Sequence, residues 1–200
     1  MSSPSTIAVA RPGRALAFTA AVLLAVAVPP ATFYGWFELH SRVIADRHAL
    51  DGGFANALKH AEAAAALYAG LRLIGASDRT SERVVIKLGI LNEYAEMYIK
   101  LGRKDSTLEM MRDLHNNMVG IAVAKWRNGA AADRRGRSEQ LVALARAGVL
   151  LQSQDDVRLS PEEMHRARQS ADLAWATTWF NQNKAAIEKR AMQALADMRS

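Results

Sequence analysis

The feature that most constrains this chain is a run of 23 residues without any charge, positions 15–37, between Arg14 and Glu38. At 1.5 Å per residue, a helix of this length extends about 34 Å, which is enough to cross the hydrocarbon core of a bilayer. Aromatic residues of the kind that lie at membrane interfaces gather near its end: Phe33, Tyr34, Trp36 and Phe37. We therefore expect residues 15–37 to form a transmembrane anchor.

A signal peptide is the alternative interpretation of this run. Residues 1–14 carry Arg11 and Arg14 as a basic flank, and Ala25-Val26-Ala27 fits a small-x-small cleavage site, so cleavage near Ala27 would release a secreted protein. The aromatic cluster favours the anchor, because it has no purpose in a cleaved peptide. A buried core helix fits less well, since such a helix rarely lacks a polar face over this length.

The positive flank predicts the orientation of the chain. Basic residues stay on the cytoplasmic side, so residues 1–14 are expected to be a cytoplasmic tail. The remainder, from residue 38 onward, is then periplasmic, and the protein is a single-pass protein of a bacterial inner membrane. The predicted partners are that membrane and a protein of the cell envelope.

Composition narrows the function classes. Half of the residues are hydrophobic and 23% are charged, which indicates a folded domain and not a disordered chain. The absence of cysteine excludes disulfides, thiolate metal ligands and a cysteine nucleophile. Beyond residue 14 there are 24 basic and 20 acidic residues (26 − 2 against 20), so no nucleic-acid partner is expected. The chain also has no Walker loop, Rossmann glycine fingerprint, HExxH or GxSxG motif.

Apolar residues at helical spacing predict an all-α fold: a linker or short helix over 38–53, and then a helical domain, 54–200, with a bundle of about five or six helices. The expected helices cover 54–74, 81–101, 106–126, 138–151 and 161–198, with a loop at 128–137. In the second helix, Val85, Leu88 and Leu91 are expected on the inner face. In the last, Trp175, Trp179 and Phe180 are expected in the core.

Three polar clusters interrupt these apolar helices. Lys59-His60 opens the Ala-rich helix, and Asn92-Glu93 follows Gly89 in the next one. The third cluster lies on one helical face, at i, i+3, i+4 and i+7: Asp113, Asn116, Asn117 and Gly120. This face offers a carboxylate, two amides and room above the glycine. His115 is expected to point elsewhere, to the surface or a helix end.

These clusters also carry a resemblance. The order K/R-H, L-G-x-x-x-E and D-x-x-N-N-x-x-G resembles an uncharacterised all-helical domain of bacterial cell-surface and polymorphic-toxin-like proteins. The similarity covers about residues 56–127, the motif-bearing core, and DLHNNMVG is its most specific part. The resemblance implies a shared fold and a shared polar cluster.

Two functions remain open for the cluster. In a hydrolase or toxin-like effector, His60 would be a general base or metal ligand, Glu93 and Asp113 would bind a divalent metal cation or orient His60, and Asn116 and Asn117 would donate to an oxyanion. Phosphodiester, phospholipid and peptidoglycan bonds are candidate targets. In a non-catalytic module for envelope assembly or partner binding, the same residues would form a structural hydrogen-bond network.

Overall fold

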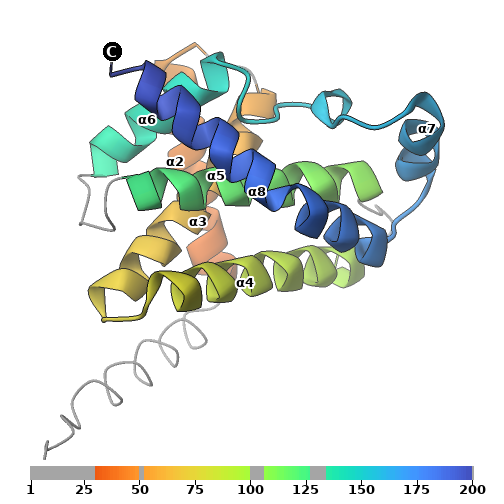
Figure 1. Ribbon diagram of the computed structural model, residues 1–200, viewed down its shortest axis with the longest axis horizontal. Coiled ribbons are helices and arrows are strands. Elements are labelled where there is room, and N and C mark those ends of the chain that lie inside the picture. The colour runs from red at the N-terminus through yellow and green to blue at the C-terminus, as the bar shows by residue number, and fades with distance from the viewer. Residues whose placement is uncertain (1–29, 50–51, 100–105, 127–133, 200) are drawn as a thin grey trace, which may run out of the picture.

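The computed structural model describes residues 30–49, 52–99, 106–126 and 134–199, and all regular elements in these ranges are helical (Figure 1). They are α2 (Pro30–Arg47), α3 (Gly52–Leu73), α4 (Asp78–Ile99), α5 (Thr107–Trp126), α6 (Arg134–Arg146), a 3-10 turn η1 (Gln154–Asp156), α7 (Pro161–Gln169) and α8 (Leu173–Asp197). The expectation of an all-α fold is confirmed.

No helix among the described residues is long and apolar enough to cross a membrane. The expected anchor lies mostly outside those residues, and only positions 30–37 of it fall within α2. This helix begins at Pro30, where the fixed φ of proline suits a first helical residue. It continues to Arg47, so most of the segment expected as a linker or short helix over 38–53 is the second half of α2 and the start of α3.

α5 lies at the centre of the molecule, and 16 of its 20 residues are buried. α3, α4 and α8 all pack against it (Figure 1). Because α5 is covered on nearly all sides, its polar side chains have to find partners inside the protein.

α4 turns a different face to the core than its apolar period predicts. Leu88 and Leu91 are 42% and 58% exposed, against the expectation that they face inward. The inner face instead follows a spacing of four residues and consists mainly of small or polar residues: Ser81, Val85, Gly89 and Glu93. These residues let α4 lie close to α5, whereas Leu88 and Leu91 point outward.

The C-terminal part is two helices, not the single helix expected over 161–198. α7 starts at a capping box formed by Ser160 and Glu163, but it ends at Gln169. Ser170 and Asp172 are held by Thr107, whose N–H and hydroxyl donate to the Ser170 carbonyl and whose hydroxyl accepts from the Asp172 N–H. Asp172 then caps α8. Tertiary hydrogen bonds thus break a helix that local propensity would continue.

Two further expectations are corrected. Residues 134–137 begin α6 and are not part of a loop, because Arg137 and Ser138 both bind the buried carboxylate of Glu62. Trp175 is only half-buried and lies under the guanidinium of Arg166, 4.1 Å from its ring centroid, whereas Phe180 is buried as expected.

Candidate functional site

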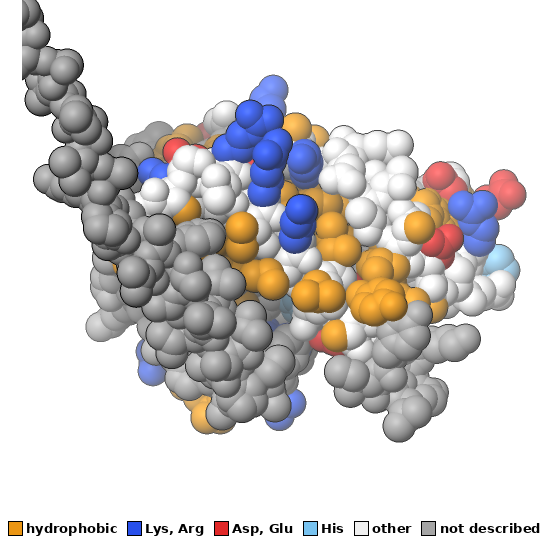
Figure 2. Space-filling view, turned by 90° about the horizontal axis from the view of Figure 1, so that it is seen from below, with side chains coloured by type: hydrophobic (Ala, Val, Ile, Leu, Met, Phe, Trp, Pro, Cys, Tyr) orange, Lys and Arg blue, Asp and Glu red, His pale blue; other side chains and the backbone are white. Residues whose placement is uncertain are grey.

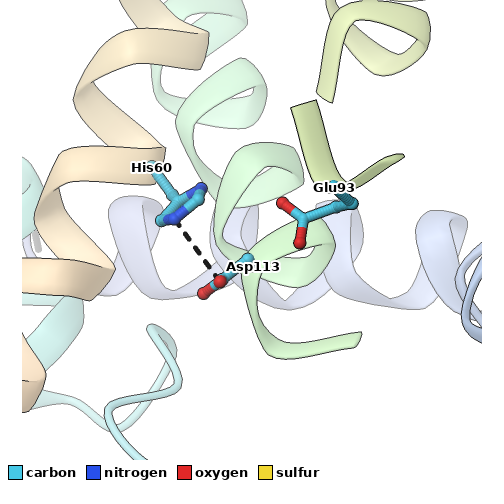
Figure 3. A group of neighbouring side chains, drawn as sticks. All are labelled: His60, Glu93 and Asp113. Atoms are coloured by element: carbon cyan, nitrogen blue, oxygen red, sulfur yellow. Dashed lines mark ion pairs between the residues drawn. The ribbon is translucent and has the colours of Figure 1, made fainter. Parts of the chain in front are cut away.

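Three helices bring three of the expected site residues together: His60 from α3, Glu93 from α4 and Asp113 from α5 (Figure 3). One ligand atom from each residue lies within 4.8 Å of the other two. The side chains are buried, with residue exposures of 5%, 2% and 5%. A His and two carboxylates that converge from separate helices inside a protein form a built polar site, not a solvated surface cluster.

The glycines of the sequence motifs allow this convergence. A Cβ at Gly120 would lie 2.1 Å from the carbonyl oxygen of Ala61, so α5 and α3 meet backbone to backbone beside His60. The space expected above this glycine is therefore filled by α3. At Gly89 a Cβ would lie 2.8 Å from the amide nitrogen of Asn117, so the second glycine lets α4 approach α5 one turn before Glu93.

Asp113 is the most heavily bound member of the site. Its Oδ1 accepts from Arg112 Nε at 2.8 Å and from Asn56 Nδ2 at 3.3 Å. Its Oδ2 lies 3.1 Å from Arg112 Nη2 and 3.4 Å from His60 Nε2. Such a two-pronged guanidinium contact fixes the plane of a carboxylate. Asp113 therefore presents Oδ2 to His60 in one orientation.

Burial sets the charge state of His60. Desolvation lowers the pKa of His60 and outweighs the opposing effect of the Asp113 carboxylate, while the neighbouring Lys59 lowers it further. The imidazole is therefore neutral at pH 7, as a metal ligand or a general base must be. Desolvation also lowers the pKa of Arg112, but the Asp113 carboxylate reverses this and the net pKa is raised. The cluster thus combines a neutral histidine with charged groups.

The structure separates the two asparagines. Asn117 lies against Gly89, on the α4 side of the site. Asn116 is fully buried elsewhere and pairs with the backbone of Leu151: its amide donates to the carbonyl and its oxygen accepts from the N–H, both at 2.9 Å. Asn116 therefore holds the segment after α6 against α5, and it does not belong to the cluster.

His115 points away from the site, as expected, but it is buried and not at the surface. Its Nε2 lies 2.9 Å from the carbonyl oxygen of Val149, and it must donate because a carbonyl can only accept. Burial lowers the pKa of His115 to about 4. The histidine of α5 is therefore a neutral structural residue.

Arg112 and Asn56 are members of the site that the sequence did not indicate. Arg112 precedes Asp113 directly, and adjacent residues of a helix do not normally face each other. Asn56 is 57 positions away from Asp113 and its side chain reaches it only through the packing of α3 on α5. No local pattern would have identified either residue.

Comparison with family models, curated proteins and solved structures found no match to this chain. The resemblance to the toxin-like helical domain therefore stays a prediction.

Proposed function

We propose that this protein is a membrane-anchored bacterial envelope protein whose helical domain binds a divalent cation through His60, Glu93 and Asp113 and uses this centre for hydrolysis. The observation that carries the proposal is the convergence of these three ligand groups within 4.8 Å in the interior. Nothing in the packing of three apolar helices requires a histidine and two acids at one point.

The donor set suits a small divalent cation. Ligands bound at about 2.1 Å in a tetrahedral site lie about 3.4 Å apart. The 3.4 Å between His60 Nε2 and Asp113 Oδ2 has this length. Oδ2 is the oxygen of Asp113 that faces His60; it accepts from Arg112 alone, whereas Oδ1 accepts from both Arg112 and Asn56. The neutral imidazole of His60 is the form that binds metal.

A cation held by His60, Glu93 and Asp113 would supply Lewis-acid polarisation of a scissile carbonyl or phosphoryl group, which water would then cleave. The protein residues would position these groups. Arg112 and Asn56 hold the carboxylate of Asp113 and so fix its Oδ2 beside His60. Asn117, one turn along α5 from Asp113, would donate to a developing oxyanion. Asn116 has no role in this proposed reaction, because its side chain hydrogen-bonds to the backbone of Leu151.

The cation test uses the full chain in detergent. Zn²⁺ or Mn²⁺ should bind the parent and raise its melting temperature, and Glu93→Gln and Asp113→Asn should bind more weakly by at least tenfold. The matched control is His165→Ala, which removes an exposed histidine of α7 and should leave binding unchanged. Equal cation binding by Glu93→Gln and the parent would contradict the proposed site.

Hydrolysis needs its own test. His60→Ala should abolish toxicity or hydrolytic activity of the expressed protein at a nearly unchanged melting temperature. A large loss of stability, with no activity in the parent on phosphodiester, phospholipid or peptidoglycan substrates, would instead favour the second candidate function below.

The second candidate is a non-catalytic module for envelope assembly or partner binding. The observation in its favour is the burial of the cluster, with each member at most 5% exposed, together with the use of both Asp113 oxygens by Arg112. In this function the polar network fixes the register of α3, α4 and α5, and the outer surface does the binding.

The proposed location rests on the uncharged run and its arginine flank. A reporter fused after Ser200 should be active only outside the cytoplasm if residues 15–37 span the inner membrane or direct secretion. Activity of the reporter in the cytoplasm would exclude both.

A further inference from the structure

The outer face of α4 combines positive charge with exposed apolar side chains in one stripe. Its members follow each other at i, i+4, i+8, i+12 and i+15, which places them on one side of the helix: Arg79, Arg83, Lys87, Leu91 and Tyr94. All five are exposed, and Leu91 and Tyr94 are 58% and 50% accessible. The first half of the stripe is basic and the second half is apolar.

A groove between α4 and α8 extends the basic half. It has a volume of about 570 Å³, and four cations line it: Arg79, Arg83, Lys87 and Lys184. Ile86 and Ile90 add apolar surface. Glu82 is the one acid in the lining, and Lys125 already binds it at 2.6 Å. Among the described residues no carboxylate pairs with any of the four cations, so their charge is directed outward.

Figure 2 looks onto this side of the molecule and shows Lys and Arg side chains next to a band of hydrophobic side chains. In Figure 1 the first turns of α2 lie toward the lower side of the molecule, where α4 also runs. The described residues begin at Pro30, within the predicted membrane anchor. The described start of α2 and the helix α4 therefore lie toward the same side of the molecule in this view.

We propose that the outer face of α4 lies on an anionic lipid surface, with Arg83 and Lys87 at the headgroups and Leu91 and Tyr94 in the interface. Basic residues attract the anionic headgroups, while leucine and tyrosine gain from leaving water for the interfacial region. A nucleic acid would use the charges but would leave the apolar half of the stripe exposed. The inference uses the proposed membrane location and is independent of the cation site.

The absence of cysteine makes a direct test simple, because one introduced cysteine can carry a polarity-sensitive fluorophore. The full chain with Leu91→Cys is reconstituted into vesicles of phosphatidylcholine alone or of an equimolar mixture with phosphatidylglycerol. We expect a blue shift of the fluorophore only with the anionic lipid, reduced by salt. The matched control is Glu162→Cys on α7, an exposed site away from α4, which should not shift.

Removing charge tests the basic half. Arg83→Gln with Lys87→Gln should lower the ratio of docked to undocked α4 about 25-fold, at about fivefold for each basic residue. A fluorophore at position 91 that stays in water on both lipids would overturn the proposal, as would an equal shift on neutral vesicles. RNA binding by the detergent-solubilised chain, without a shift on anionic vesicles, would overturn it in favour of nucleic acid.

A vesicle flotation assay tests insertion of the predicted anchor separately from docking through α4. A chain that floats with both kinds of vesicle is inserted, and the position of α4 is then read from the fluorophore. If the chain does not insert, the proposed anchor fails, but flotation with anionic vesicles alone would still support docking through α4. Flotation with neither kind would overturn both.

Discussion

Replacing Gly120 with alanine tests how closely α3 and α5 pack. The new Cβ would lie 2.1 Å from the Ala61 carbonyl oxygen, 2.8 Å from its carbon and 2.9 Å from its Cα. Ordinary contact begins near 3.4 Å, so the helices must separate by about 1.3 Å (3.4 − 2.1). A backbone cannot rotate away as a side chain can. Overpacking of this kind costs about 3 kcal/mol or more, which exceeds the gain of about 1 kcal/mol in helix propensity.

Gly70 provides the matched control for this substitution. It lies near the end of α3, and a Cβ there meets nothing within 4 Å. Gly70→Ala should therefore stabilise the protein by about 0.5–1 kcal/mol. In thermal unfolding in detergent, a net loss of about 2 kcal/mol (about 3 − 1) corresponds to a fall of about 4–8 °C for Gly120→Ala. If Gly120→Ala is as stable as the parent, the close contact between the helices is wrong.

Three further predictions concern residues around the site. Asn116→Ala should cost about 1–3 kcal/mol in denaturant unfolding, because both backbone groups of Leu151 lose a buried partner, and cation binding should not change. His115 has a pKa lowered to about 4 from an ordinary value of 6.5, so stability should be full above pH about 6.5 and fall by about 3 kcal/mol as the pH drops to about 4. His115→Gln should flatten this part of the pH–stability curve, and an unchanged slope would argue against a neutral buried imidazole. Trp175→Ala should cost less than the roughly 3–5 kcal/mol of a fully buried tryptophan, because Trp175 is half-buried under Arg166, and unfolding measurements would show a larger loss if it belonged to the core.

The central helices were predictable because local signals and burial agree there. The helix expected over 106–126 is α5 almost to the residue, and that expected over 54–74 is close to α3. No long run there alternates apolar and polar residues, so no strand pattern competes with the helical spacing. The prediction failed at 170–172, where Thr107 binds the backbone of a distant segment. No feature of the local sequence indicates such a hydrogen bond.

The spacing of the apolar residues in α4 predicted the wrong buried face, again because contacts with distant segments decide it. Leu88 and Leu91 are the larger side chains, but a close helix–helix approach selects the small residues for the inner face, such as Gly89. Polar side chains are buried there as well, and Glu93 lies beside His60 of α3 and Asp113 of α5. Glu93 is therefore inside and the leucines are outside.

The helical class, the uncharged N-terminal run and the polar residues His60, Glu93 and Asp113 within apolar helices could all be predicted from the amino-acid sequence. Helical spacing and polarity are local properties, so a single chain displays them. The convergence of these three residues, the pairing of Asn116 with the Leu151 backbone and the contacts of Arg112 and Asn56 with Asp113 depend on the tertiary fold. These choices depend on which faces of α3, α4 and α5 meet, and this is set by the packing of residues far apart in the chain.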